Sequence, residues 1–223
     1  NTADLDGDGD LDVIVAAAWT QDHITWFESN GASPPSFTTR TISRTEDGSM
    51  NWMFSVQAED IDGNGRLDLI SATLGGNLEW YRNDGGRPLA FTKQEIASSA
   101  STFDVVAADL DGDGHPDLVA TLNFTSGHEV VWYKNDPSTA SHFESTPSVI
   151  STRGTLDVPI QLSVADINGD SYLDVIVVSV SDNRVSWFES SGGANPTFTH
   201  HIITDVADGA LGVHVADLDG NGH

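Results

Sequence analysis

Cysteine is absent from the 223-residue sequence, and basic residues are scarce. Without cysteine, the chain can form neither a disulfide framework nor a thiolate metal site. Nine Lys and Arg residues stand against 34 Asp and Glu residues, which gives a formal net charge of −25. This charge excludes a nucleic-acid binder that depends on phosphate contacts, and it disfavours docking on anionic membranes. No run of 18 apolar residues occurs, so no membrane insertion is predicted for this segment.

Acidic charge is concentrated in a short motif that occurs five times. The copies begin at Asp4, Asp60, Asp109, Asp166 and Asp217, at intervals of 49–57 residues. Self-similarity at such a period indicates a repeat architecture. We expect repeat units at residues 1–56, 57–105, 106–162 and 163–213, with a truncated fifth unit at residues 214–223.

Each unit contains four short apolar runs rich in Val, Ile, Phe, Trp and Thr, separated by turn residues. Runs of this kind predict β-strands, and no window has a sustained helical period. Four antiparallel strands per unit of about 50 residues are typical of one β-propeller blade. The sequence therefore predicts an all-β chain of about four blades. We expect it to be a segment of a ring of six to eight blades, with seven favoured, because the fifth motif stops before its last aspartate.

The recurring loop is a candidate metal site. Oxygen-bearing side chains occupy loop positions 1, 3, 5 and 9, counted from the first aspartate, and oxygen donors suit a hard cation. Position 7 varies, which fits a ligand supplied by the backbone carbonyl. Position 6 is Gly in four copies, where a tight turn calls for a left-handed backbone. The predicted side-chain ligands are Asp4, Asp6, Asp8, Asp12, Asp60, Asp62, Asn64, Asp68, Asp109, Asp111, Asp113, Asp117, Asp166, Asn168, Asp170, Asp174, Asp217, Asp219 and Asn221, with backbone carbonyls from Asp10, Arg66, His115 and Tyr172.

Ca²⁺ suits these loops better than Mg²⁺, which demands a stricter octahedron and keeps more of its water. We expect one ion per complete loop, or four to five in this segment. An EF-hand would need a glutamate at position 12 and flanking helices, but that position holds Val15, Ser71, Ala120 and Val177 in predicted strands. A solvated acidic turn is the simpler alternative, and the repetition of the pattern in register argues against it.

These residues resemble the FG-GAP/VCBS repeat family, which includes the blades of integrin α-subunit propellers. The resemblance rests on the D-x-D-G-D-G-x-x-D loop with the following L-D-V/L-I/V segment. It also rests on a downstream W-F/Y-x-N-x-G-x-x-P-x-F segment, as in "WFESNGASPPSF" at residues 26–37. The resemblance implies a propeller fold, calcium in the loops, and extracellular adhesion or carbohydrate-related roles. Ser171 departs from the pattern, because it replaces glycine in the fourth loop.

Several aromatic residues fall outside the loops. Trp26, Trp80, Trp132 and Trp187 recur once per unit and are expected in the core. Non-recurring residues lie in connections predicted at the ends of the blades opposite the loops. Those considered as ligand contacts are Trp19, Trp52, Phe124 and His128. Asn123 begins the only N-x-S/T glycosylation sequence.

No nucleophile elbow, zinc-protease motif or phosphate-binding loop occurs, so a non-catalytic protein is expected. The sequence favours a secreted or cell-surface propeller that serves as an adhesion, scaffold or assembly module. Its expected partners are other proteins or copies of itself in a surface assembly. Two alternatives stay open, a lectin-like propeller that binds glycans and a polysaccharide lyase or hydrolase built on a propeller.

Overall fold

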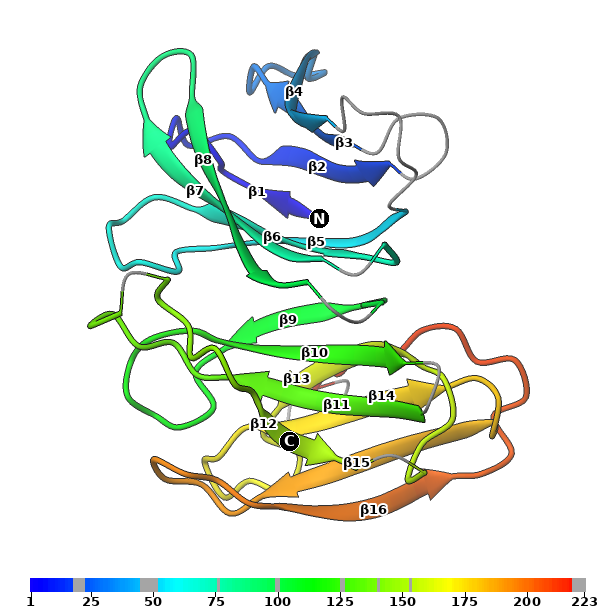
Figure 1. Ribbon diagram of the computed structural model, residues 1–223. Coiled ribbons are helices and arrows are strands. Elements are labelled where there is room, and N and C mark those ends of the chain that lie inside the picture. Colours follow the sequence, from blue (N-terminus) through cyan, green and yellow to red (C-terminus); the bar gives the residue numbers. More distant parts are fainter. Residues whose placement is uncertain are drawn as a thin grey trace. The chain divides into compact units, whose positions relative to one another are not determined.

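The computed structural model describes residues 1–17, 23–44, 52–75, 77–98, 101–124, 127–139, 141–152 and 154–217. These residues form strands, turns and bends, and none of them is helical. The chain divides into two compact units, Asn1–Thr102 and Phe103–His223. Each unit holds two four-stranded sheets (Figure 1).

The first unit contains two antiparallel sheets in which each strand pairs with its neighbour in the sequence (Figure 1). The first sheet consists of β1 (Thr2–Ala3), β2 (Asp12–Ala17), β3 (His23–Ser29) and β4 (Phe37–Arg44). The second consists of β5 (Met53–Glu59), β6 (Asp68–Thr73), β7 (Leu78–Gly85) and β8 (Ala90–Ala97).

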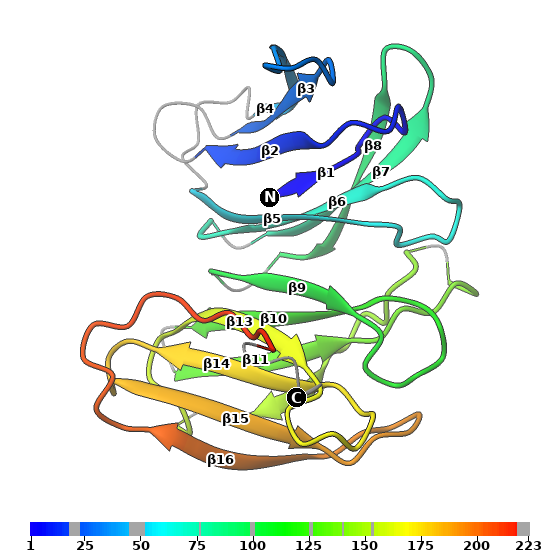
Figure 2. The same ribbon diagram turned by 180° about the vertical axis from the view of Figure 1, so that it is seen from behind.

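The second unit repeats this arrangement (Figure 2). Its first sheet consists of β9 (Val105–Ala108), β10 (Asp117–Phe124), β11 (Gly127–Tyr133) and β12 (Ser148–Ser151). Its second sheet consists of β13 (Pro159–Ala165), β14 (Asp174–Ser179), β15 (Arg184–Ser190) and β16 (Phe198–Thr204). Four-stranded antiparallel meanders of this kind are β-propeller blades, so the predicted all-β propeller fold is confirmed. A total of six to eight blades stays a prediction.

Each acidic loop lies between the first and second strands of its sheet. The loop after β5, for example, leads directly into β6, and the two strands pair from Glu59 and Asp68 onward. The strand that ends one sequence repeat is thus the first strand of the next sheet. A short loop favours this pairing because it brings its two flanking strands together at little cost in chain entropy.

Residues 210–217 form no strand, although the sequence analysis expects one before the fifth loop. In the other sheets the equivalent strand, such as β9 or β13, is hydrogen-bonded to the strand that follows the loop. The Val213 N–H instead donates to the side-chain Oε1 of Gln161 at 3.0 Å, and the expectation of a strand was wrong.

In the second, third and fourth sheets along the chain, the second strand is the most deeply buried. Every residue of β6 and of β14 is buried, whereas β8 and β16 contain no buried residue. The run Val175–Val178 of β14 is continuously apolar, as expected for a strand that is covered on both faces, whereas β6 also buries Asp68, Ser71 and Thr73. The predicted core positions of Trp26, Trp80 and Trp132 are confirmed, since they are 3%, 0% and 4% exposed. Trp187 is half-buried and stacks on His201, with ring centroids 4.6 Å apart.

Candidate metal centres

The four complete loops share one pattern of backbone hydrogen bonds. In the first loop, Asp4 Oδ1 accepts from the Asp8 N–H at 3.0 Å, and Asp4 Oδ2 accepts from the Gly9 N–H at 2.9 Å. Asp8 Oδ1 in turn accepts from the Asp10 N–H at 3.0 Å. Equivalent bonds recur in the loops that begin at Asp60, Asp109 and Asp166. In each loop, the backbone N–H groups of positions 5, 6 and 7 are therefore hydrogen-bonded to side-chain oxygens of the same loop.

Position 6 requires a left-handed backbone, as expected from its glycine. The φ angles of Gly9, Gly65 and Gly114 are 96°, 81° and 89°. A Cβ at these glycines would meet no atom within 4 Å, so the backbone angle and not space selects glycine. Ser171 holds φ at 73° in the fourth loop. That loop keeps the shared conformation with a residue that adopts it less readily.

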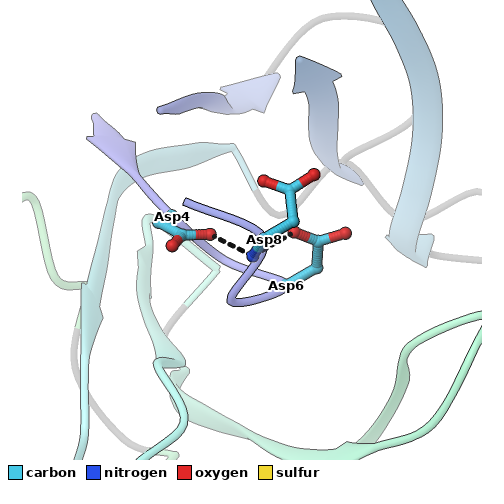
Figure 3. A group of neighbouring side chains, drawn as sticks. All are labelled: Asp4, Asp6 and Asp8. Carbon is cyan, nitrogen blue, oxygen red and sulfur yellow. Dashed lines mark hydrogen bonds between the residues drawn. The ribbon is translucent and has the colours of Figure 1, made fainter. Parts of the chain in front are cut away.

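Carboxylates converge in the first three loops. Oxygens of Asp4, Asp6 and Asp8 all lie within 4.8 Å of one another, and Figure 3 shows these three side chains around the turn. Burial, followed by the neighbouring charge of Asp8, raises the pKa of Asp6. Carboxylate oxygens also lie within 4.8 Å of one another in two further groups, which are Asp60, Asp62 and Asp68, and Asp109, Asp111 and Asp117.

The fourth loop differs from the others, because an amide stands at position 3. Asn168 Nδ2 donates to Asp170 Oδ2 at 3.0 Å and to Glu189 Oε1 at 3.2 Å. Among the described residues, its carboxylates form no group of three like those of the other loops. Amide oxygens of Asn64 and Asn168 each accept a backbone N–H, which leaves each of them one lone pair for an ion.

The aspartate at position 9 anchors each loop to its sheet. Asp117 Oδ1 accepts from the Asn135 N–H at 2.8 Å, and Asp117 Oδ2 accepts from the Leu110 N–H at 3.1 Å. Asp12 and Asp174 make the equivalent pairs of bonds. Burial raises the pKa of Asp68 and of Asp117 to about 6. Metal ligation by position 9 stays a prediction, and the structure adds this anchoring role.

In three of the loops, the position 7 side chain contacts a glycine at or just after the end of the third strand, a contact that the sequence analysis missed. A Cβ at Gly31 would collide with the Asp10 carboxylate, and one at Gly192 would collide with the Tyr172 ring. A Cβ at Gly85 would be in ordinary contact with Arg66 Cδ at 3.5 Å, and Arg66 Nε donates to Asn83 O at 2.8 Å. In the sequence, the glycine five residues after the recurring tryptophan, at Gly31, Gly85 and Gly192, signals this contact. Ligation by the backbone carbonyls of position 7 stays a prediction.

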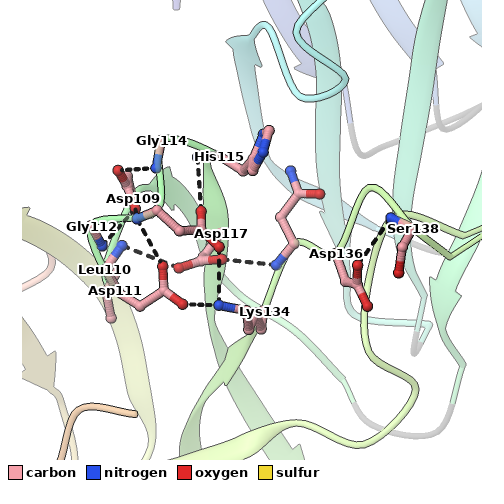
Figure 4. Close-up of polar contacts among 12 residues, drawn as sticks. Asp109, Leu110, Asp111, Gly112, Gly114, His115, Asp117, Lys134, Asp136 and Ser138 are labelled. Carbon is pink, nitrogen blue, oxygen red and sulfur yellow. Dashed lines mark hydrogen bonds and ion pairs between the residues drawn. The ribbon is translucent and has the colours of Figure 1, made fainter. Parts of the chain in front are cut away.

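A second feature missed from the sequence is the residue after each Trp-Phe/Tyr pair, which we call the flanking position. Strand register places it beside the position 9 aspartate, because Leu118 pairs with Tyr133, and Asp117 and Lys134 come next. The flanking residues are Glu28, Arg82, Lys134 and Glu189. In the third loop Lys134 Nζ contacts Asp111 Oδ2 and lies 3.0 Å from Asp113 Oδ2 (Figure 4). In the sequence, the signal for this feature is that the charge of the flanking residue changes from one repeat to the next.

The remaining candidates lie apart from the loops. Trp52 is 36% exposed and stacks on Phe54, with ring centroids 6.4 Å apart. His128 lines an open hollow of about 550 Å³ with Asp157, Asp182 and Arg184. Predictions for Trp19, Asp219, Asn221 and the side chain of Phe124 fall outside the described residues. Asp217 is exposed and lies outside any strand.

Asn123 lies in β10, and both polar atoms of its side-chain amide are buried. A glycan is bonded to the amide nitrogen of asparagine, so that atom must be accessible. The fold therefore argues against the expected glycosylation at this position.

The donor set of the loops fits a divalent hard cation. The side-chain oxygens that could ligate a metal belong to carboxylates and amides. In the first loop, the Oδ2 atoms of positions 3 and 5 accept no backbone N–H among the described hydrogen bonds. The fold and these loops define a β-propeller with acidic sites that could hold a metal.

A model of the FG-GAP-like repeat matches residues 4–71, 60–120 and 166–223, which together make up more than half of the sequence. The chain belongs to the FG-GAP-like repeat family.

No curated protein matches the chain. Within the described residues, no helix has the length and apolar composition that crossing a bilayer requires.

Proposed function

We propose that this chain is a calcium-stabilised, extracellular β-propeller module with a non-catalytic role in adhesion, scaffolding or protein assembly. The carrying observation is the hydrogen-bond pattern shared by four loops, which turns carboxylates at positions 1, 3 and 5 toward one another in the first loop. Like charges held this close are unfavourable without a partner of opposite sign. Family membership supports calcium as that partner.

Calcium would be held by Asp4, Asp6 and Asp8 in the first loop and by the equivalent residues of the other three. A bound ion would neutralise the carboxylates and cross-link the turn that leads into the second strand of the sheet. Sites of extracellular modules bind calcium with Kd on the order of 10⁻⁴–10⁻³ M. At about 1 mM calcium, each such site adds about 0.4–1.4 kcal/mol to the free energy of unfolding.

This energy supports an extracellular location. Four sites at about 1 mM calcium add about 2–6 kcal/mol, comparable to the total stability of many domains. At micromolar calcium the same sites would stay largely unbound, and the loop carboxylates would repel. The strong negative charge and the absence of catalytic motifs from the sequence support a binding or assembly role. Other proteins, or copies of this chain in a surface assembly, are the proposed partners.

Calcium titration by calorimetry tests the proposal. The wild-type chain is compared with Asp62→Ala, which removes a position 3 carboxylate, and with Asp205→Ala, which removes an exposed carboxylate outside the loops. We expect Asp62→Ala to lose one bound ion, while Asp205→Ala keeps the wild-type stoichiometry. Equal stoichiometry in all three proteins, or no heat of binding at millimolar calcium, would contradict the proposal.

Glycan binding is the second candidate function, and exposed aromatic residues favour it. Trp52 and Phe54 present a partly exposed stacked pair near the start of β5, at the opposite end of that strand from the second loop. Aromatic faces of this kind stack against sugar rings. Loss of glycan-array binding on Trp52→Ala would support the candidate, and an array without any hit would remove it.

A further inference from the structure

Lys134 places a cation in the third acidic loop. Its ammonium contacts Asp111 Oδ2 and lies 3.0 Å from Asp113 Oδ2, so it bridges the carboxylates at positions 3 and 5 (Figure 4). The Asp111 side chain is fully buried, and that of Lys134 is 27% exposed. Solvent therefore screens this contact less than it would screen a surface ion pair.

The other flanking residues do not place a cation in their loops. Arg82 donates through Nε and Nη2 to Asp84 Oδ1, at 3.0 and 2.7 Å, and Asp84 lies outside the second loop. Glu28 pairs with Arg40 at 2.5 Å. Glu189 brings a further carboxylate to the fourth loop, where its Oε1 accepts from Asn168 Nδ2.

We propose that Lys134 is a built-in counter-ion of the third loop, which holds this loop folded without calcium and lowers its affinity for calcium. The inference rests on the calcium-binding function proposed above. Oδ2 atoms of Asp111 and Asp113 that face the ammonium are the oxygens that a bound ion would need. An ion can enter only if the ammonium leaves, and two cations in one small site repel each other.

The four sheets consequently differ in their dependence on calcium. In the third loop a tethered charge replaces part of the neutralisation that calcium supplies elsewhere. In the fourth loop Asn168 removes one carboxylate and Glu189 returns one from the flanking position. The flanking residue therefore changes the charge of the third and fourth sites without changing the loop.

The test compares three full-length proteins, the wild type, Lys134→Met and Arg82→Met. Methionine keeps much of the apolar length and removes the charge. Arg82→Met is the matched control, because it removes a cation from the equivalent position of the second sheet, where that cation pairs with Asp84 outside the loop. Calcium is titrated into ¹⁵N-labelled protein, and the amide resonances of Gly65 and Gly114 report the second and third loops separately.

We expect Lys134→Met to bind calcium at the third loop roughly tenfold more tightly than the wild type, with the Gly65 titration unchanged. In EDTA it should melt at a lower temperature than Arg82→Met, because the third loop has lost its counter-ion. Lys134→Arg keeps the charge, so its Gly114 titration should stay close to the wild-type curve.

The two proposals fail in different ways. If Gly65 responds to calcium and Gly114 titrates identically in the wild type and in Lys134→Met, the counter-ion role is overturned and calcium binding stands. If neither amide responds in any variant at millimolar calcium, calcium binding is overturned together with the inference. If Lys134→Met does not fold in EDTA but folds in calcium and binds it more tightly, the counter-ion role is supported.

Discussion

The indole Nε1 of Trp80 donates a hydrogen bond to Asp68 Oδ2 at 3.0 Å, and this bond ties the second acidic loop to the core. Both side chains are fully buried, at 0% exposure. Asp68 Oδ1 also accepts from the Asn83 N–H at 2.6 Å. The carboxylate that ends the loop is therefore held by β7 through a side chain and a backbone group, and the recurring tryptophan has a role beyond filling the core.

The first sheet supplies a natural comparison for this bond. The buried Nε1 of Trp26 has no hydrogen-bond partner among the described residues. Trp80→Phe and Trp26→Phe remove the same volume, but only Trp80→Phe removes a bond to a buried carboxylate. We expect Trp80→Phe to lower the free energy of unfolding by about 1.5–3 kcal/mol more than Trp26→Phe does. Urea denaturation at fixed calcium measures both, and equal losses would show that the Trp80–Asp68 bond adds no net stability.

A second prediction concerns the backbone of position 6. Because Ser171 holds φ at 73°, Ser171→Gly should relieve strain in the fourth loop and raise the free energy of unfolding by about 0.5–1 kcal/mol. Gly114→Ala should lower it by about 1 kcal/mol, since φ at Gly114 is 89° and a Cβ there meets no other atom. Chemical denaturation gives both values, and changes of the same sign would contradict the shared left-handed turn.

Removal of calcium gives a third prediction. The stabilisation of about 2–6 kcal/mol from four sites corresponds to a rise in melting temperature of at least about 4 °C at millimolar calcium. Calorimetric scans with EDTA and with calcium, at constant ionic strength, measure this shift. Magnesium at the same concentration should raise the melting temperature less, because it dehydrates reluctantly and prefers octahedral geometry. A shift below about 2 °C would leave the calcium-stabilised propeller without its energetic basis.

His200 gives a prediction on pH that does not involve the loops. Burial, followed by the nearby charges of Arg184 and His201, lowers the pKa of His200 below 6.5, while Asp182 opposes this shift. Its ring stacks on Phe188, with centroids 4.9 Å apart. A lowered pKa in the folded state favours the neutral form, so this contribution to stability is present above about pH 6.5 and is lost as the pH falls through the folded-state value.

Nuclear magnetic resonance titration of the His200 ring measures that value directly. Arg184→Gln should raise the pKa of His200 toward its ordinary range, and Asp182→Asn should lower it further, because each removes one of the opposing charges. His200→Gln should reduce the loss of stability between pH 7 and pH 5. A wild-type pKa at or above 6.5 would refute the effect of burial.

Much of the candidate site was accessible from the sequence because its chemistry is local. Asp4 binds the amides of residues four and five positions later, so the spacing of the motif alone predicts the turn. The left-handed backbone of Gly9 follows from the same tight turn. Strands were equally accessible, since β14 for example contains the continuous apolar run Val175–Val178.

The sequence by itself determined the all-β fold, the acidic loops and the repeat of about 50 residues, because each depends on residues close together in the chain. Only the tertiary structure decided what lies beside each loop. Lys134 reaches Asp111 because β11 pairs with β10 in a register that brings together residues 23 positions apart. The tertiary structure likewise decided that residues 210–217 form no strand, although their sequence resembles the runs that precede the other loops.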